Sequence, residues 1–316
     1  MAKQMTILEE RGTKRELFVN NLMGSRGKAK RGRYLGSPIR YAGGKSLAVG
    51  LVLEHIPEGT KRLISPFLGG GSVEVACAIE LGMPVLAFDI FQILMTYWDV
   101  QLHHPTALYH RLLKLQPTRE EFSKVKARLK KHWDGEEMLG KLDLAAHFYF
   151  NHNTSYGPHF LGWPSNIYLD PERYKKLLAK VRGFRADKLE VACKSFEEVI
   201  PNHKHDFLYC DPPYFLGGDS KTFVGMYPHR NFPIYHNGFR HDLLRDMLLA
   251  HKGGFVLSYN DCSKIRKWYK GFQMTTPSWQ YSFSQGDTRI GPNRLNNNNG
   301  LYTKKSHELL IWRTPK

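Results

Sequence analysis

Residues 62–89 read RLISPFLGGGSVEVACAIELGMPVLAFD, and this stretch indicates how the chain folds. Its apolar start, residues 62–66, predicts a short strand, and the run over 73–81 predicts a helix. A second strand is expected over 84–88 and is closed by Asp89. Because a strand, a helix and a further strand in succession build a parallel sheet, the stretch predicts an α/β fold.

The rest of the chain repeats this alternation, except in one segment. The other expected elements are helices over 45–55, about 90–102, 238–251 and 263–269, and strands over 189–193, 207–210, 255–259 and 308–313. Residues 105–183 instead read as helices rich in Lys, Arg, His and aromatic side chains. The sequence therefore predicts a doubly wound, mainly parallel sheet formed by residues 36–104 and 184–316, with an inserted helical subdomain at 105–183. Long loops are expected over 215–237 and 284–305, and we interpret the first as functional.

Lysine and arginine together outnumber aspartate and glutamate by 46 to 29, which gives a formal net charge of +17. Such an excess favours a polyanionic partner, and a nucleic acid fits better than an anionic membrane because no long amphipathic basic helix occurs. Residues 1–35 are expected to form a basic arm, since five of the eight residues from 26 to 33 are Lys or Arg. Contact with phosphate and a solvated tail are both open for this arm.

The four cysteines are scattered along the chain and form no C-x-x-C pair. The first ten residues contain acids and lack the apolar stretch of a signal peptide, and no apolar run approaches the length of a membrane span. These features predict a cytoplasmic protein with reduced thiols, without a structural zinc site and without a membrane segment.

A second informative stretch is Asp211-Pro212-Pro213-Tyr214, which closes the strand expected over 207–210. Neither proline can donate to a sheet ladder, and each restricts the residue before it to extended geometry. The Asp211 carboxylate and the Pro212 carbonyl can accept the two hydrogens of an exocyclic amine and localise its lone pair, while Tyr214 stacks on the heterocycle. These four residues therefore predict a catalytic site for a planar amine, and a plain strand-ending turn is the alternative.

The turn FLGGGS at 67–72 lies between an expected strand and an expected helix. Glycines there let the backbone approach a ligand, and the helix N-terminus presents free N–H groups. Asp89, about twenty residues further on at the end of the next strand, is placed to accept hydrogen bonds from ribose hydroxyls. Together with the Asp-Pro-Pro turn, these features predict a nucleoside cofactor. A tight packing turn and a plain strand-end acid are the alternatives.

Three other chemistries do not fit the residues. GGKS at 43–46 resembles the end of a phosphate-binding loop, but Ile39 stands where that loop needs a glycine. Cys210 lies inside an expected strand and before Asp211, so we interpret it as a small core residue and not as a nucleophile. No Ser/His/Asp arrangement or metal-ligand spacing occurs in the sequence, and we therefore expect no metal.

Eight short motifs occur in the order typical of the Dam-like DNA adenine-N6 methyltransferases. They are RYAGGK (40–45), PFLGGGS (66–72), FDI (88–90), FYFN (148–151), SF (195–196), YCDPPY (209–214), LSYN (257–260) and ELL (308–310). The chain resembles this family from about Pro38 to Arg313, which is nearly its whole length. The resemblance implies the Rossmann-like class I methyltransferase fold, with S-adenosylmethionine as the cofactor.

By this resemblance, the expected cofactor contacts are Tyr41, Lys45, Phe67, Gly69, Gly71, Ser72, Asp89, Ile90, Phe196 and Asp211. Asp89 is expected on the ribose, Phe196 against the adenine, and Asp211 near the reactive methyl group. The family usually has an acid where this chain has Ser65, often Trp where it has Tyr41, and commonly Asn where it has Phe91. The departure at Ser65 leaves open how the sulfonium or amino-acid end of the cofactor is held.

The resemblance also implies that the helical insertion reads double-stranded DNA. The candidates for base contact are Asn151, Asn153, Tyr156 and Trp163, and those for phosphate contact are Lys130, Lys131, Arg182 and Arg185. For each of them, an ordinary surface or core position is the alternative. A monomer or weak dimer is expected, and a cognate restriction endonuclease is left open as a further partner.

The sequence thus predicts a site-specific DNA adenine-N6 methyltransferase that acts on an adenine rotated out of the duplex. An RNA adenine methyltransferase, or an enzyme acting on another planar amine, is compatible with the same Asp-Pro-Pro-Tyr turn. A DNA-binding relative without activity is the alternative from a different functional class. The insertion and the C-terminal motifs favour DNA as the substrate.

Overall fold

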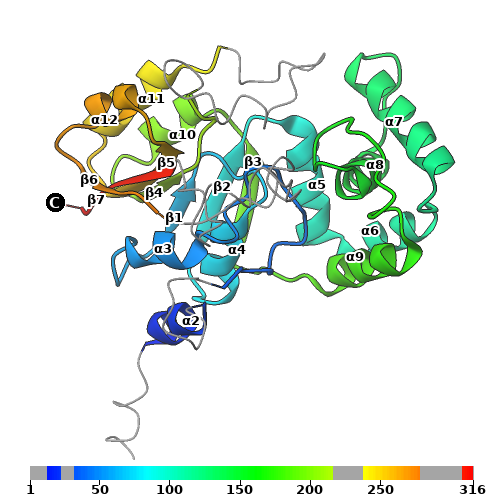
Figure 1. Ribbon diagram of the computed structural model, residues 1–316, viewed down its shortest axis with the longest axis horizontal. Coiled ribbons are helices and arrows are strands. Elements are labelled where there is room, and N and C mark those ends of the chain that lie inside the picture. The colour runs from blue at the N-terminus through cyan, green and yellow to red at the C-terminus, as the bar shows by residue number, and fades with distance from the viewer. Residues whose placement is uncertain (1–12, 23–31, 216–237, 278–307, 316) are drawn as a thin grey trace, which may run out of the picture.

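The fold is built around a seven-stranded sheet with the strand order β3-β2-β1-β4-β5-β7-β6, seen in the computed structural model in Figure 1. The structure describes residues 13–22, 32–215, 238–277 and 308–315, and the statements below concern these residues. The strands are β1 (Leu63–Ser65), β2 (Val85–Asp89), β3 (Leu189–Cys193), β4 (Phe207–Cys210), β5 (Phe255–Asn260), β6 (Gln273–Thr275) and β7 (Glu308–Arg313).

The order of the strands reverses at β1, which pairs in parallel with β2 on one side and with β4 on the other. The pairs β2–β3 and β4–β5 are also parallel, whereas β7 is antiparallel to both β5 and β6. The chain thus leaves β1 toward β2 and β3 and returns at β4, which makes a topological switch point. Ligands of open α/β sheets bind outside the carboxyl ends of the strands at such a point. The predicted doubly wound, mainly parallel sheet is confirmed.

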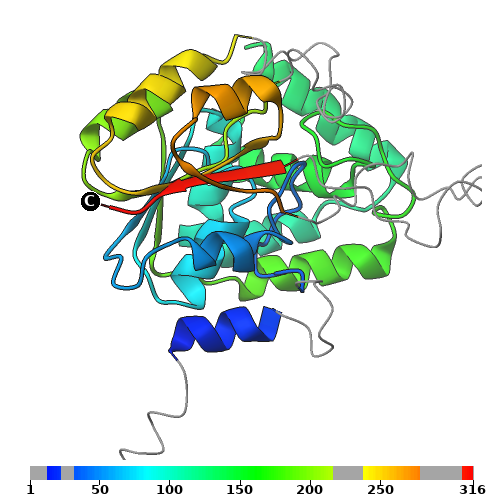
Figure 2. The same ribbon diagram turned by 60° about the vertical axis from the view of Figure 1, so that its left-hand side comes forward.

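Helices cover both faces of the sheet, as Figure 2 shows. The helices α3 (Val49–Glu54), α4 (Ser72–Ile79) and α5 (Gln92–His103) lie on one face, and α10 (Phe196–Asn202), α11 (His241–Ala250) and α12 (Ser263–Trp268) lie on the other. Because side chains alternate along a strand, Leu63 and Tyr209 join the first core cluster, while their neighbours Ile64 and Leu208 join the second. Burial on both faces explains why these strands read as apolar runs.

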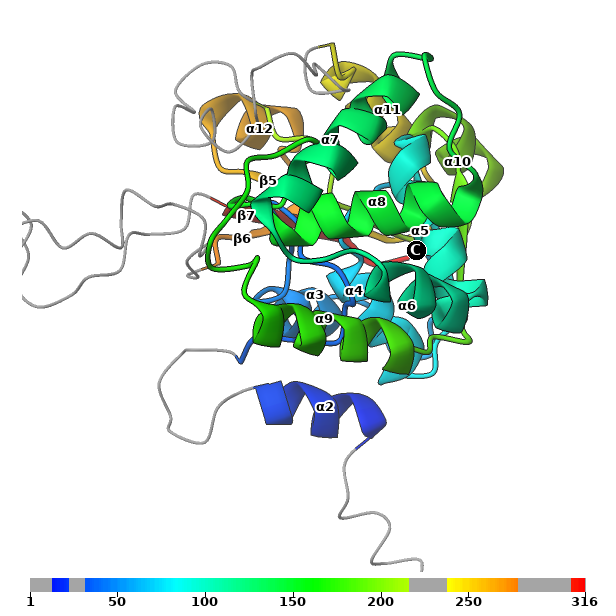
Figure 3. The same ribbon diagram turned by 90° about the vertical axis from the view of Figure 1, so that its right-hand side faces the viewer.

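Residues 105–183 are helical, as predicted. Their helices are α6 (Pro105–Leu113), α7 (Arg119–Trp133), α8 (Lys141–Thr154) and α9 (Pro171–Gly183), and Figure 3 looks onto this helical layer. The side chain of Thr118 accepts a hydrogen bond from the Glu121 N–H at 3.1 Å, and Asp170 accepts one from the Arg173 N–H at 2.9 Å. These caps satisfy N–H groups that the first turns of α7 and α9 leave without a helical partner.

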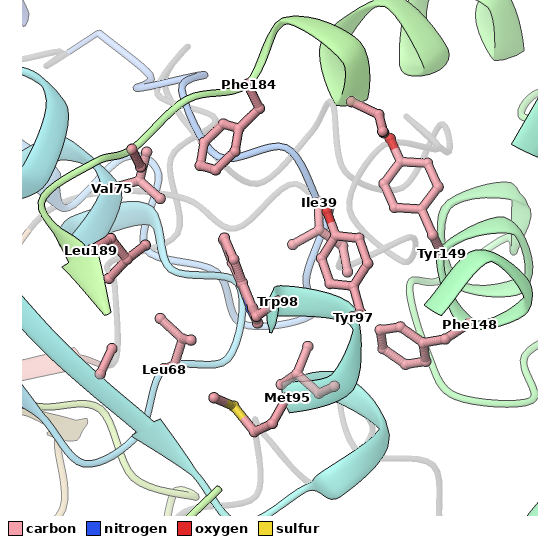
Figure 4. Close-up of a cluster of buried hydrophobic side chains, with 14 of the residues drawn as sticks. Ile39, Leu68, Val75, Met95, Tyr97, Trp98, Phe148, Tyr149, Phe184 and Leu189 are labelled. Carbon is pink, nitrogen blue, oxygen red and sulfur yellow. The ribbon is translucent and has the colours of Figure 1, made fainter. Parts of the chain in front are cut away.

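The helical layer and the sheet share one hydrophobic core. The Tyr97 ring of α5 stacks on the Tyr149 ring of α8 with centroids 5.4 Å apart, and Trp98 meets Phe184 at 6.1 Å (Figure 4). These side chains belong to a single buried cluster that extends from α3 to α9. The division of the chain into a sheet domain and an inserted subdomain stays a prediction.

Three details differ from the sequence-based expectation. The helix expected over 45–55 begins only at Val49, and the short edge strand β6 was not expected. Part of the basic arm forms α2 (Lys14–Leu22), which buries Val19 and sets the Phe18 ring edge-on to Tyr34 at 5.7 Å, so this part is docked and not a loose tail. The rest of the arm and the long loops over 216–237 and 284–305 lie outside the described residues.

Within the described ranges, no helix combines the length and apolar character needed to cross a membrane.

Candidate active site

A cavity of about 620 Å³ opens at the carboxyl ends of β1, β2 and β4, beside the topological switch point. Its volume lies within the range of about 300–1,000 Å³ that small-molecule sites occupy. The lining includes every residue that the sequence analysis placed at the cofactor or the reacting amine, namely Tyr41, Lys45, Phe67, Gly69, Gly71, Ser72, Asp89, Ile90, Phe196, Asp211, Pro212, Pro213 and Tyr214. Segments that are far apart in the sequence therefore meet in one place.

The Gly-rich turn is held tightly against Tyr41. Gly69 and Gly71 have φ angles of 46° and 63°, in the left-handed region that favours glycine. A Cβ atom added to Gly70 would lie 2.4 Å from the Tyr41 Cβ, so a larger residue does not fit there. The Trp98 indole N–H also donates to the Gly69 carbonyl at 3.0 Å. The glycines therefore permit a turn that packs directly under one wall of the cavity.

Asp89 joins the end of β2 to the same turn. Its carboxylate accepts hydrogen bonds from the Gly69 N–H and the Phe91 N–H, both at 3.0 Å. Burial raises the pKa of Asp89, and these backbone N–H groups oppose the rise. The side chain remains partly exposed and lines the cavity, so it can still accept a hydrogen bond from a ligand.

Three phenylalanines form an apolar wall beside Asp89. The Phe196 ring lies 5.6 Å from the Phe67 ring and 5.2 Å from the Phe239 ring. Such a cluster offers flat surfaces to a planar heterocycle. Phe239 was missed by the sequence analysis because it precedes α11 without any motif around it.

The Asp211–Tyr214 turn is held in place by an ion pair. The Lys45 ammonium lies 2.8 Å from Oδ1 of Asp211 and 3.5 Å from Oε1 of Glu308 in β7. The Asp211 side chain keeps 20% of its surface exposed, whereas Lys45 is buried. Burial raises the pKa of Asp211, and Lys45 pulls it back by favouring the charged carboxylate. Lys45 thus contacts Asp211 and also lines the cavity.

Tyr214 is more buried than a ring that stacks on a ligand in an open site would be. Its residue is only 6% exposed, and its hydroxyl donates to Glu308 and lies 3.2 Å from the Ser258 hydroxyl. Burial also raises the pKa of Glu308 to about 7. Tyr214 lines the cavity, so its stacking on a heterocycle stays a prediction. The hydrogen bond to Glu308 links the end of the Asp211–Tyr214 turn to β7.

A second buried acid, Glu74, lies beneath the Gly-rich turn. Its Oε1 accepts a hydrogen bond of 2.6 Å from the Ser65 hydroxyl at the end of β1. Glu74 lines the cavity, and burial raises its pKa to about 8. The sequence analysis missed this residue, although one acid within the otherwise apolar helix SVEVACAI was a usable signal.

The helical layer supplies an aromatic wall on the other side of the cavity. The Phe91 ring lies 5.3 Å from Phe160, 6.0 Å from Phe148 and 6.2 Å from Trp133. His152 of α8 stacks on Tyr41 at 5.6 Å, and burial lowers its pKa to about 3, which keeps the ring neutral. Sequence reasoning missed this wall because its members come from separate helices and loops.

Two of the expected base-contacting residues are interior, which corrects the sequence-based expectation. Asn151 and Asn153 of α8 are both buried. The Asn153 amide accepts from the Arg40 N–H and donates to the Tyr149 carbonyl, both at 3.0 Å. They face inward because α8 is buried almost all round between the sheet side and its neighbouring helices. Asn151 and Asn153 therefore have no access to a duplex in this conformation.

The other insertion candidates divide into two groups. Tyr156 and Trp163 are 51% and 71% exposed, and the Tyr156 N–H donates to the Trp163 carbonyl at 2.8 Å. The loop that they close carries Pro158, His159 and Phe160, which line the cavity, so the two exposed rings lie at its rim. Lys130 and Lys131 are exposed on the last turn of α7, close to Trp133 of the aromatic wall.

Arg182 and Arg185 lie away from the cavity, and their contact with phosphate stays a prediction. Arg182 is at the end of α9, and Arg185 precedes the amino-terminal end of β3. Because β3 is parallel to β2, only its carboxyl end lies on the cavity side of the sheet. The two arginines are therefore at the amino-terminal edge of the sheet, opposite the cavity. Within the described part of the chain, no cluster of His, Cys, Asp and Glu is arranged to hold a metal ion.

Comparison with known proteins places the chain in a family. The family profile described as D12 class N6 adenine-specific DNA methyltransferase matches residues 41–283. The chain is 26% identical over 268 residues to the DNA N-6-adenine-methyltransferase of Escherichia phage P1, which covers 80% of this chain and 34% of the phage protein. It is 25% identical over 304 residues to the Type II methyltransferase M.FokI of Planomicrobium okeanokoites, which covers 88% of this chain and 45% of that protein. The chain thus spans less than half the length of either relative.

The matched segment contains the Gly-rich turn, Asp89, the helical layer and the Asp211–Tyr214 turn, and it is well over half of the chain. Together with the strand order, the match identifies the sheet as a class I S-adenosylmethionine-dependent methyltransferase fold. The chain belongs to the D12 class N6 adenine-specific DNA methyltransferase family.

Proposed function

We propose that this chain transfers a methyl group from S-adenosylmethionine to the N6 amine of an adenine in double-stranded DNA. One observation carries the proposal. The Asp211–Tyr214 turn opens into the same cavity as the Gly-rich turn and Asp89. Direct transfer requires the amine and the methyl donor to meet within about 3–3.5 Å, and a shared cavity allows this.

The residues around the cavity fit S-adenosylmethionine. The Asp89 carboxylate suits the ribose hydroxyls, and the ring cluster around Phe196 suits the adenine. Asp211 and Glu74 both line the cavity, and their carboxyl groups favour a positively charged ligand group there. When bound, this cofactor supplies a methyl group activated by a sulfonium.

The Asp211–Pro212 corner prepares the amine for attack. The Asp211 carboxylate and the Pro212 carbonyl accept its hydrogens, and this localises on nitrogen the lone pair that the adenine ring otherwise delocalises. Lys45 holds Asp211 in position and favours its charged form against the effect of burial. Fixed acceptors that face the developing positive charge on nitrogen lower the barrier without a covalent enzyme intermediate. The released proton passes to Asp211 or to water.

The substrate adenine must leave the base stack to reach the cavity, at a cost of a few kcal/mol. The exposed rings of Tyr156 and Trp163 at the cavity rim can contact the opened duplex, and Lys130 and Lys131 can contact its phosphates. The formal net charge of +17 agrees with a polyanionic substrate. Asn151, Asn153, Arg182 and Arg185 are not part of this proposed surface.

A transfer assay with tritium-labelled S-adenosylmethionine tests the proposal. We expect label in duplex DNA, recovered as N6-methyladenine, and little or none in RNA of matched sequence. Label in RNA alone would overturn the DNA assignment. Cofactor binding by calorimetry without transfer to any nucleic acid would instead favour an inactive relative. Methylation-sensitive long-read sequencing of plasmid expressed with the protein would then give the recognition sequence.

A further inference from the structure

Glu74 is a buried acid that the proposed reaction does not use. It stands in the first turn of α4 and is 2% exposed, yet it lines the cavity beside Lys45, Tyr209 and Asp211. It accepts hydrogen bonds from the Ser65 hydroxyl, 2.6 Å from Oε1, and from its own backbone N–H. A carboxylate out of water is costly unless a partner compensates its charge, and these two neutral donors compensate it only in part.

The charges around the cavity floor leave an excess of acid. The Lys45 ammonium already lies 2.8 Å from Asp211 and 3.5 Å from Glu308. Within the described part of the chain, no Lys, Arg or His forms an ion pair with Glu74. The floor therefore combines three carboxyl groups with one ammonium, an arrangement that favours a cationic ligand group.

The order of strand ends indicates which ligand group this is. Asp89 ends β2 and Asp211 follows β4, and the end of β1, with Ser65, lies between them. With the ribose at Asp89 and the methyl-bearing sulfur toward Asp211, the amino-acid end of the cofactor extends from the sulfur across the floor that Glu74 and Lys45 form. We propose that Glu74, held in place by Ser65, binds the positively charged α-ammonium group of the cofactor. The inference rests on the proposed function for the identity of that cofactor.

Ser65 explains how this chain reaches that arrangement. The strand-end position that the resembling family usually fills with an acid carries a hydroxyl here, and Glu74 brings a carboxylate to this hydroxyl from the neighbouring helix. The carboxyl group thus stays at the same corner but comes from α4 instead of β1. Ser65 acts as a positioning residue, because its hydroxyl holds Oε1 of Glu74.

Binding calorimetry with two ligands tests the proposal. The ligands are S-adenosylmethionine and its analogue in which hydrogen replaces the α-amino group, and the proteins are the wild type, Glu74→Gln and the control Glu190→Gln. A Gln side chain can still accept the Ser65 hydrogen bond, and Glu190 is exposed on β3 away from the cavity. We expect Glu74→Gln to weaken S-adenosylmethionine binding by about tenfold to a hundredfold. The analogue should bind wild type and Glu74→Gln equally, and Glu190→Gln should match the wild type.

Equal losses for both ligands, or no loss for either, would overturn the role of Glu74 at the ammonium. If the wild type bound neither ligand, the cofactor assignment itself would fall, and the proposed function with it. If the wild type transfers methyl groups and Glu74→Gln loses the same affinity for both ligands, the proposed function stands and only this inference is overturned. The patterns are therefore distinguishable.

A measurement on the wild type alone covers the case in which Glu74→Gln fails to fold. Calorimetry at pH 7 in two buffers of different ionisation enthalpy reports proton release on binding. The groups that face Glu74 are Ser65 of β1, Cys77 of α4, Lys45, Tyr209 of β4 and Asp211. Because a carboxyl that pairs with an ammonium gives up its proton, S-adenosylmethionine should release more protons than the analogue. Equal release would contradict the proposal.

Discussion

Asp211 depends on two opposing influences at the scale of single residues. Burial favours its neutral form, and the Lys45 ammonium at 2.8 Å favours the carboxylate that the proposed chemistry needs. Glu308 of β7 contacts both Lys45 and Tyr214, so the Asp211–Tyr214 turn is held by a strand that comes almost a hundred residues later in the chain. The turn therefore acts as part of a buried polar network and not as an isolated motif.

Replacing Asp211 with Ala should lower the rate of methyl transfer by at least about a hundredfold, because one fixed acceptor for the amine is lost. The fold should persist, since the Lys45 ammonium keeps Glu308 as a partner. Initial rates with labelled cofactor, together with circular dichroism, measure both effects. The matched control is Asp187→Ala, an exposed acid outside the cavity. Turnover at the wild-type rate by Asp211→Ala would contradict the assignment of the turn.

The two acids Glu74 and Glu308 predict a pH-dependent stability. Their pKa values rise from 4.5 to about 8 and about 7 in the folded protein, so the folded chain holds protons that the unfolded chain has released. The free energy of unfolding should therefore fall as the pH rises from about 4.5 to 8. Glu74→Gln should make this decline shallower, as measured by urea unfolding at pH 5.5 and pH 8. Glu190→Gln is the control and should show the same decline as the wild type. If the free energy of unfolding of Glu74→Gln falls just as steeply, this would count against the burial of Glu74.

At the scale of elements, the Gly-rich turn matters because of what packs on it. Tyr41 lies against Gly69 and Gly70, and its other side meets His152 of α8. The turn between β1 and α4 is thus connected to the helical layer through one aromatic ring. A change in the turn is transmitted to the cavity wall by displacement of that ring.

Gly70→Ala should destabilise the protein by about 1–3 kcal/mol and weaken cofactor binding, because the new Cβ would lie 2.4 Å from the Tyr41 Cβ. Gly140→Ala is the control, since a Cβ at Gly140 meets nothing within 4 Å. Chemical unfolding and calorimetry with S-adenosylmethionine measure the two effects. Identical behaviour of the two variants would show that Tyr41 yields without cost.

The loop between Tyr156 and Trp163 belongs to the same scale. Trp163→Ala should weaken binding to duplex DNA by about tenfold, because an exposed ring that contacts a base contributes about 1–3 kcal/mol. Cofactor binding should be unchanged, since the Trp163 ring does not line the cavity. Fluorescence anisotropy with labelled duplex measures the loss, with the exposed Met138→Ala as the control. Unchanged DNA affinity in Trp163→Ala would remove this loop from the proposed DNA surface.

At the scale of the whole molecule, the sheet and the helical layer are bound by one hydrophobic cluster. Tyr97, Trp98 and Tyr149 are fully buried at their junction. Separating the layer from the sheet would expose these rings to water, at a cost of about 25 cal/mol for each Å² of apolar surface. The cavity lies along this junction, so the wall from the layer and the floor from the sheet keep a fixed relation.

This shared core predicts a single unfolding transition. Thermal unfolding followed by far-UV circular dichroism and by tryptophan fluorescence should give the same midpoint, because Trp98 lies on the sheet side of the junction and Trp133 in the helical layer. Two transitions with separate midpoints would show that the layer folds independently, as the predicted inserted subdomain would allow.

Local sequence determined the fold class and indicated the residues that we propose for catalysis and cofactor binding. Strand, Gly-rich turn and helix follow one another within residues 62–89, and the Asp211–Tyr214 turn closes an apolar strand. Such features depend on propensity, on the φ freedom of glycine and on the missing N–H of proline, which act over a few residues. For that reason these features can be recognised in the sequence alone.

Tertiary structure alone decided which side chains share the cavity and which are interior. Asn151 and Asn153 looked like base contacts, but the all-round burial of α8 places them in the core. Glu74 and Glu308 come from α4 and β7, and only the strand order brings both toward Lys45 and Asp211. Burial and charge pairing arise between segments distant in the chain, and the local sequence pattern does not encode these distances.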